Sequence, residues 1–436
     1  MTQTERGAPG RAPAVRGEPS APRAPEAAAP QTRLQARSWL PLGLVVLLVV
    51  LQFLAPSRAW MILLCGLGGM LIAAYFWARA LARGVRLRRR LRYGWAQVGE
   101  MLEEEFTLHN GAWWRALWVE VEDRSTVPGY AVQQVLAIGG GETFRWREQA
   151  LCRRRGIYRL GPWTLRMGDP FGFFRVIQHY EQVQTLVVVP PVQALPSIPL
   201  PRGVAVGRAV ARQPATDITL NVSSTRRYLP GDPLRRIHWP STARQGHLIC
   251  KDFDAEISGD AWIVLDLDSA VQAGQGEEST EEYGVILAAS LADQMLRLNR
   301  AVGLIVSGAA TVTLLPRQGQ GQRWEILQAL ARVQAGQGPP LGRLLEEMRP
   351  LLGQRMTVAV ITPDDGTAWV EGLWPLLRRG IAPTAILLDA ASFGRPAQVE
   401  SLRAMLLGLG IPTQVVGRGL LAAEAGPRPF GSWEFK

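Results

Sequence analysis

The amino-acid sequence predicts a multidomain protein with a two-helix transmembrane hairpin, a small β domain and an α/β domain. Two stretches near the N-terminus carry no charge, residues 95–191 alternate apolar and polar positions, and residues 259–420 alternate apolar strands with amphipathic helices. A chain of 436 residues, of which 47% are hydrophobic, is long enough to build two or three cores.

Residues 1–36 are predicted to be a disordered cytoplasmic tail. They are rich in Ala, Pro, Gly and Arg and lack apolar periodicity, so they bury too little surface to offset chain entropy. A cleaved leader is the competing interpretation. It is disfavoured because apolar sequence begins only near Trp39 and a second apolar stretch follows.

A transmembrane hairpin is predicted over residues 37–79. Residues 39–55 and 59–78 are uncharged, and at about 1.5 Å per residue each is long enough for a membrane span. Pro56-Ser57-Arg58 joins them. A pair of buried helices in a soluble core is the alternative, but such helices seldom lack a polar face. Aromatic residues suited to the headgroup region lie near the predicted ends: Trp39, Trp60, Tyr75 and Trp77.

Arginine placement predicts the orientation of the hairpin in the cell membrane. Arg33 and Arg37 precede it and seven arginines follow between residues 79 and 92, whereas its tip carries only Arg58. The positive-inside rule therefore puts both termini and the soluble domains in the cytoplasm. The basic juxtamembrane segment, residues 80–94, is expected to contact anionic lipid. This position explains much of the net charge of +11, so no nucleic-acid partner is expected.

Residues 95–191 are predicted to form the β domain. Met101–Leu108, Ala116–Glu122 and Thr185–Val189 alternate apolar and polar side chains, as strands with one buried face do. Gly161-Pro162 and the turn at residues 168–170 bound a further strand around Thr164–Arg166.

Residues 192–258 are interpreted as a linker and a motif region, residues 259–420 as the α/β domain, and residues 421–436 as a C-terminal tail. Alternating strands and helices predict a mostly parallel sheet covered on both faces. The expected strands are Trp262–Leu267, Val302–Ser307, Thr357–Thr362, Ala385–Leu388 and Thr413–Val416. The expected helices are Glu281–Arg300, Arg323–Val333, Leu341–Met348, Ala368–Arg379 and Ala397–Gly408.

The most distinctive motif runs from residue 226 to residue 244. Pro230-Gly231 suits the centre of a type II turn, and Asp232 is placed to pair with an arginine on either side. Two interpretations stay open: a surface that binds an anion or a partner through its arginines and Trp239, or a rigid corner held by ion pairs. A triad of Ser241, His238 and Asp232 is disfavoured because no nucleophile elbow surrounds Ser241.

The motif resembles that of membrane proteins carrying "domain of unknown function 58". The matching positions are Arg226, Tyr228, Gly231, Asp232, Arg235, Ile237, Trp239, Ala243 and Arg244. Residues 154–162 and Asp169-Pro170-Phe171-Gly172 resemble the family's upstream elements. With the two adjacent spans, the likeness extends from about residue 39 onward.

The resemblance implies a von Willebrand factor A-like, Rossmann-type fold for the α/β domain. Such domains often hold a divalent cation through Asp-x-Ser-x-Ser after the first strand, since hard cations prefer oxygen ligands. Here the stretch is Asp266-Leu267-Asp268-Ser269-Ala270, in which one hydroxyl ligand is absent. Asp364 or Asp365 is a candidate further ligand for Mg²⁺ or Ca²⁺. Acidic loops that cap helices are the alternative interpretation.

The resemblance also implies the function. Family members are similar to components encoded beside MoxR-type AAA ATPases and near transglutaminase-like membrane proteins. We therefore expect a membrane-anchored, non-enzymatic interaction and assembly protein that works with a MoxR-type AAA ATPase. The alternative is a metal-dependent hydrolase using Asp266, Asp268 and Asp364 or Asp365. The three cysteines lie far apart in the sequence and suggest neither disulfides nor a zinc site.

Overall fold

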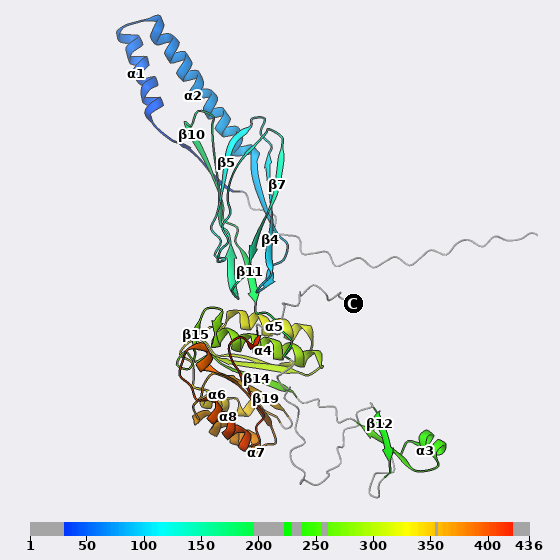
Figure 1. Cartoon of the computed structure of the whole chain (residues 1–436). Coiled ribbons are helices and arrows are strands. Elements are labelled where there is room, and N and C mark those ends of the chain that lie inside the picture. The colour runs from blue at the N-terminus through cyan, green and yellow to red at the C-terminus, as the bar shows by residue number, and fades with distance from the viewer. Residues whose placement is uncertain (1–29, 196–221, 229–236, 254–259, 354–355, 422–436) are drawn as a thin grey trace, which may run out of the picture.

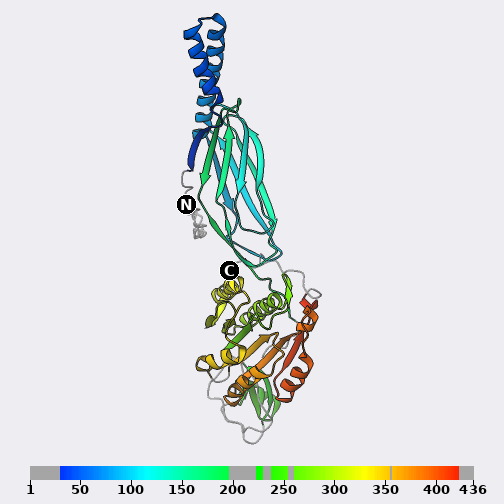
Figure 2. The ribbon, with the colours of Figure 1, turned by 90° about the vertical axis from the view of Figure 1, so that its left-hand side faces the viewer.

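The computed structural model describes residues 30–195, 222–228, 237–253, 260–353 and 356–421. A helical hairpin, a β domain and an α/β domain follow one another along the long axis of the molecule (Figures 1 and 2). A small unit carrying β12 and α3 lies to one side of the α/β domain (Figure 1). The predicted tails and linker lie mostly outside the described residues.

Helices α1 (Leu40–Leu54) and α2 (Arg58–Gly84) pack side by side as a hairpin. Ser57 caps the N-terminus of α2, and its side-chain oxygen accepts a hydrogen bond from the Ala59 amide. By length and composition α2 is the one helix among the described residues that qualifies as a membrane span, and 6% of its most apolar stretch is buried. Helix α1, with 15 residues, is shorter than a full span.

The β domain consists of three sheets around one core. Their strand orders are β1-β10-β9-β5-β6, β2-β4-β7 and β3-β11-β8. The bounds are β1 Gln31–Ala36, β2 Val85–Leu91, β3 Trp95–Gln97, β4 Met101–Asn110, β5 Ala116–Asp123, β6 Gln133–Ile138, β7 Thr143–Leu151, β8 Gly156–Leu160, β9 Trp163–Gly168, β10 Phe174–Tyr180 and β11 Gln184–Val189. The strands predicted within β4, β5, β9 and β11 are confirmed. Ala78 and Leu81 of α2 belong to the same core.

Two boundaries of this domain were predicted wrongly. Residues 31–36, assigned to the disordered tail, form β1 and pair with β10 along their whole length. Residues 85–91, assigned to the basic juxtamembrane segment, form β2 and pair with β4. In β2 the apolar Val85 and Leu87 alternate with exposed arginines and face the core. The density of arginines favoured the lipid-contact interpretation, although the alternation of apolar and charged residues is that of a strand with one buried face.

The basic segment at residues 80–94 was predicted to contact anionic lipid, but its Arg89, in β2, points into the protein. Its side chain is fully buried and forms ion pairs with Glu104 at 2.6 Å and Asp123 at 3.2 Å. Tyr130 donates a hydrogen bond to Glu104. Burial lowers the pKa of the Arg89 guanidinium, but the neighbouring carboxylates outweigh burial, and the net shift is upward. This arginine therefore belongs to a buried ion-pair cluster.

The α/β domain has a six-stranded sheet with the order β18-β17-β14-β19-β20-β21. Its strands are β14 Ala261–Asp266, β17 Val302–Ser307, β18 Val312–Arg317, β19 Thr357–Thr362, β20 Ala382–Leu388 and β21 Thr413–Val416. They are parallel except β18, which pairs antiparallel with β17. A small hairpin of β15 (Gly274–Gln275) and β16 (Glu278–Ser279) precedes α4. Strand β18 and this hairpin were not predicted.

Helices cover both faces of the sheet. Helices α4 (Thr280–Arg297) and α5 (Gly319–Arg332) contribute to one core, and α6 (Leu341–Glu347), α7 (Trp374–Arg378) and α8 (Val399–Gly408) to the other. Short 3-10 helices occur at Arg349–Leu351, Ala368–Leu373 and Ala390–Phe393. The helix predicted over Ala368–Arg379 is therefore split into a 3-10 segment and α7, which has Pro375 in its first turn.

Candidate functional site

The motif residues belong to a separate small unit, which we call the motif unit. Strand β12 (Val222–Arg227) pairs antiparallel with β13 (Ile249–Phe253), and α3 (Trp239–Gln245) connects to β13. The Tyr228 amide donates to the Leu248 carbonyl. Ile237 is 4% exposed and bridges to Cys250. Of the predicted site residues, Gly231, Asp232 and Arg235 lie outside the described residues, and Arg226 is described only by its place in β12.

Helix α3 presents the exposed part of the motif. Trp239 is 64% exposed, Ala243 and Arg244 are exposed on the same short helix, and Leu248 is 39% exposed just before β13. A tryptophan and an arginine exposed together are typical of binding surfaces. The structure thus separates the motif into Ile237, which packs inside the unit, and Trp239 and Arg244, which face outward.

His238 and Ser241 are in hydrogen-bond contact, with 2.7 Å between Nδ1 and Oγ. The Ser241 amide also donates to the His238 carbonyl, as expected where a helix begins after His238. Asp232, the third member of the disfavoured triad, lies outside the described residues.

The predicted cation site lies at the carboxyl ends of β14 and β19. Asp266 is 2% exposed, and its carboxylate accepts hydrogen bonds from Thr362 Oγ1 at 2.7 Å and from the Asp268 amide at 3.0 Å. Burial raises the pKa of Asp266 to about 6, and the negative charges of Asp364 and Asp268 act in the same direction. The sheet therefore brings these three carboxylates near one another.

The same carboxylates also organise their own loops. Asp268 accepts from the Ala270 amide at 3.1 Å, and Asp364 accepts from the Gly366 amide at 2.8 Å. Asp365, the alternative third ligand, instead pairs with Arg395 at 3.0 Å and caps the chain before α8. In the part of the chain that the structure describes, no three His, Cys, Asp or Glu side chains form a group suited to a metal ion.

The sequence did not predict the junction between the β and α/β domains. Arg155, 4% exposed at its side chain, donates to the carbonyls of Leu330 and Val333 at the end of α5 and to Glu281 at 2.8 Å, and it also pairs with Glu282. A guanidinium at a helix C-terminus and carboxylates at a helix N-terminus both complement the helix dipole. Trp95 and Trp324 meet edge to face beside it, with their ring centroids 5.6 Å apart.

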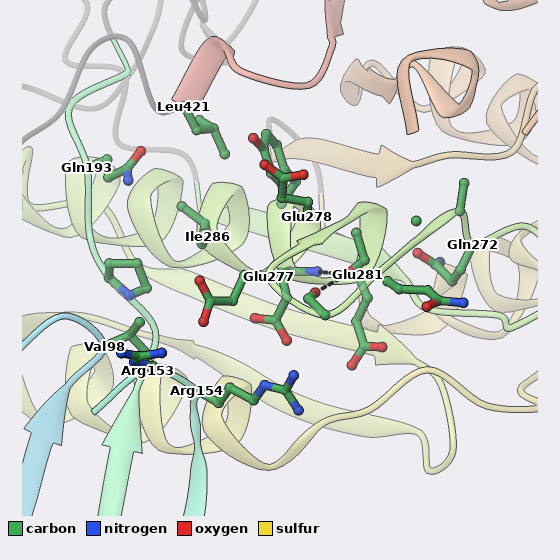
Figure 3. Close-up of a pocket in the computed structure, with 18 residues that line it drawn as sticks. Val98, Arg153, Arg154, Gln193, Gln272, Glu277, Glu278, Glu281, Ile286 and Leu421 are labelled. Atoms are coloured by element: carbon green, nitrogen blue, oxygen red, sulfur yellow. Dashed lines mark hydrogen bonds between the residues drawn. The ribbon is translucent and has the colours of Figure 1, made fainter. Parts of the chain in front are cut away.

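A cleft of about 470 Å³ opens next to this junction (Figure 3). Arg153 and Arg154 line it from the β domain, and Glu277, Glu278 and Glu281 from the hairpin and α4. The one feature of the sequence that could have indicated this contact is the complementary charge of residues 153–155 and residues 277–282. The two runs are more than a hundred positions apart, so neither indicated the other.

Arg155 is expected to couple the two domains mechanically. Replacing Arg155 with Ala removes the partner of two carboxylates and two carbonyls, so the end of α5 should open more readily. We expect amide hydrogen exchange of residues 330–333 to quicken roughly tenfold, equivalent to about 1.4 kcal/mol of local stability. The matched control is Arg154→Ala, because Arg154 is exposed. Equal exchange in both variants would contradict the coupling.

Comparison with known proteins identifies a domain but no activity. Residues 224–371 match the family described as "Protein of unknown function DUF58". Uncharacterized proteins of Mycobacterium tuberculosis and Mycobacterium bovis are 30% identical over 110 residues, which is 24% of this chain and 34% of each relative. The match therefore spans about a third of the length of these relatives.

Similarity to solved structures is weak. Proximal thread matrix protein 1 from the mussel byssus is 14% identical, with a TM-score of 0.28, over 38% of this chain and 45% of that one. The CARDB domain of a Pyrococcus furiosus protein is 12% identical, with a TM-score of 0.18, over 24% of this chain and 90% of that one.

Proposed function

We propose that this protein is a membrane-anchored interaction and assembly protein that works with a MoxR-type AAA ATPase. The observation that carries the interaction role is the exposed surface of the motif unit, where Trp239 is 64% exposed and Arg244 is exposed on the same short helix. This surface lies within the matched DUF58 region, at the opposite end of the molecule from the helical hairpin (Figure 1). The von Willebrand factor A-like character of the α/β domain is part of the same proposal.

Two membrane spans are proposed because both ends of the hairpin continue into the same domain. Strand β1, before α1, pairs with β10, and β2, after α2, pairs with β4. A single crossing by α2 would put these strands on opposite sides of the bilayer. If α2 crosses, α1 must therefore cross back. The short α1 would be accommodated by local thinning of the bilayer or by the residues that flank it.

Recovery of the partner tests the interaction role. The full-length protein should co-purify a MoxR-type AAA ATPase from detergent-solubilised membranes, and Trp239→Ala should reduce recovery roughly tenfold, which is a usual loss for an interface tryptophan. Trp374→Ala is the matched control, because Trp374 is 48% exposed on α7, away from the motif unit. Equal recovery with both variants, or no ATPase at all, contradicts the proposal.

Cysteine labelling tests the two spans and their orientation. In a chain whose three cysteines are replaced by Ala, Ser57→Cys at the hairpin tip should react with an impermeant maleimide in intact cells. Ser269→Cys, exposed after β14, should react only after permeabilisation. The reverse pattern would contradict the cytoplasmic orientation. Reaction of both cysteines in intact cells would contradict the crossing.

A metal-dependent hydrolase remains the second candidate. It is supported only by the electrostatic influence of Asp268 and Asp364 on the buried Asp266, whose pKa is raised to about 6, since the described side chains do not form a ready metal-binding group. Calorimetry with Mg²⁺, Ca²⁺ and Mn²⁺ should then give saturable heat that Asp266→Asn abolishes. Absence of heat with all three ions would rule this candidate out.

A further inference from the structure

The exposed apolar surface of α2 ends where the helix meets the β domain. Phe76 is 61% exposed, whereas Ala74 and Ala78 are fully buried, as is Leu81 one turn further on. Tyr75 contacts Phe174 of β10 with their ring centroids 5.8 Å apart. If α2 lies in a bilayer, the lipid headgroups are therefore level with the turn from Tyr75 to Ala78.

Two loops of the β domain reach α2 at this level. The loop at residues 111–115 packs Trp114 against Trp77, with their ring centroids 4.5 Å apart, and the Arg115 carbonyl accepts a hydrogen bond from the Trp77 indole. The loop at residues 169–173 lies beside the start of the hairpin, where the Arg37 amide donates to the Phe173 carbonyl at 2.8 Å.

Each loop carries an exposed aromatic side chain, and that of Phe171 also stacks on Phe173 with ring centroids 6.0 Å apart. Trp113 is 93% exposed and Phe171 is 49% exposed. Exposing a large aromatic ring to water is unfavourable. A highly exposed tryptophan next to an apolar helix therefore indicates a surface that contacts lipid or another protein.

Buried polar side chains hold both loops in these conformations. Asn110 is fully buried and donates to the Trp114 and Gly139 carbonyls, while its side-chain oxygen accepts from the Ala112 amide. Asp169 is 3% exposed and accepts from the Phe171 and Phe174 amides. A Cβ at Gly140 would collide with the Trp113 carbonyl, so the first loop is also closely packed. The two exposed rings are thus presented by fixed backbones.

The charges around these rings suit a phosphate-bearing surface. Arg37, Arg79 and Arg115 are exposed next to the two loops and the hairpin. Within residues 111–115 and 169–173 the one carboxylate is that of Asp169, which is buried, and the exposed Glu142 of the adjoining turn accepts a hydrogen bond from the Gly139 amide. Arginines interleaved with aromatic rings are the combination that favours the interface of an anionic bilayer.

We propose that Trp113 and Phe171 form a lipid-docking tip, seated in the headgroup region of an anionic membrane with Arg37, Arg79 and Arg115 around it. This inference rests on the proposed membrane anchor and adds a second attachment. The hairpin alone would leave the domains free to tilt, whereas the lipid-docking tip fixes the β domain against the bilayer. The α/β domain, which the Arg155 contacts join to the β domain, would then be held at a set distance from the membrane.

Spin labelling of the full-length protein in vesicles tests this assignment. In a chain lacking other cysteines, a nitroxide at Trp113→Cys should collide with oxygen more often than with a water-soluble nickel chelate. A nitroxide at Trp374→Cys in the α/β domain should show the reverse. Phosphatidylcholine vesicles with phosphatidylglycerol should place the first label deeper than phosphatidylcholine alone, because the arginines attract the anionic headgroups.

A third label at the native Cys65 of α2 separates failure of the tip from failure of the anchor. If the label at Cys65 is in lipid while the label at residue 113 behaves as in water, the lipid-docking tip is refuted and the anchor stands. If both labels behave as in water, the membrane anchor itself is refuted. Several-fold protection of residue 113 from the chelate, with Cys65 in lipid, is the supporting result.

Discussion

Replacing Arg89 with methionine is expected to destabilise the β domain by about 3–5 kcal/mol, the usual cost of removing one partner from a buried ion pair. The substitution would leave Glu104 and Asp123 charged and buried, since the side chains of all three residues are fully buried. The guanidinium also lies 5.4 Å from the ring centroids of Phe106 and Trp163, so a cation–π contribution is lost as well.

Pulse proteolysis in detergent across a urea series measures this loss. Arg88→Met is the matched control, because Arg88 is the exposed neighbour in the same strand. Combining Arg89→Met with Glu104→Gln and Asp123→Asn should recover much of the stability, since no unpaired charge then remains buried. A similar midpoint for Arg89→Met and Arg88→Met would refute the structural role of the cluster.

The pH dependence of stability is expected to reflect Asp266. Its pKa is about 6 in the folded protein, above the ordinary value of 3.8, so the folded state binds a proton more tightly than the unfolded state. The proton on Asp266 therefore adds to the free energy of unfolding. This added stability is fully present below about pH 4 and is lost as the pH rises through 6. Two pKa units correspond to about 3 kcal/mol, and Asp266→Asn should abolish that loss between pH 4 and pH 8.

The measurement is the urea midpoint of the full-length protein at several pH values. Asp389→Asn is the control, because this partly exposed carboxylate also follows a strand of the sheet and is not among the charges that raise the pKa of Asp266. If the wild-type protein and Asp266→Asn lose stability in parallel as the pH rises, the raised pKa is wrong.

The sequence predicted best those strands that are buried on both faces. Val302–Ser307 and Thr357–Thr362 have the predicted bounds, because inner strands of a mostly parallel sheet are continuous apolar runs. Strand β18 was missed because it is an edge strand containing Pro316 with only one side half-buried. Strand β1 was missed because Leu34 is its one partly buried residue and β10 supplies its pairing.

The candidate site was predictable only where local sequence carried the information. The motif marked Trp239 and Arg244, which are exposed, but gave no indication that Ile237 would be a core residue of the unit. Arg155 lay in a recognised element, yet its partner Glu281 is 126 positions away, so its role depended on the tertiary fold. Likewise, the sequence did not indicate a role for Trp113. Its loop lies next to α2 only because β4 and β5 fold there.

The pairing of β1 with β10 has a mechanical consequence. Six consecutive residues of β1 are paired, and the strand leads through a short connection into α1. Tension that pulls the helices away from the soluble body would load this ladder in shear, along the strand axis, so that its hydrogen bonds resist together rather than opening one by one. The β2–β4 ladder takes the other half of the load, so the hairpin and the body should withstand force as one piece.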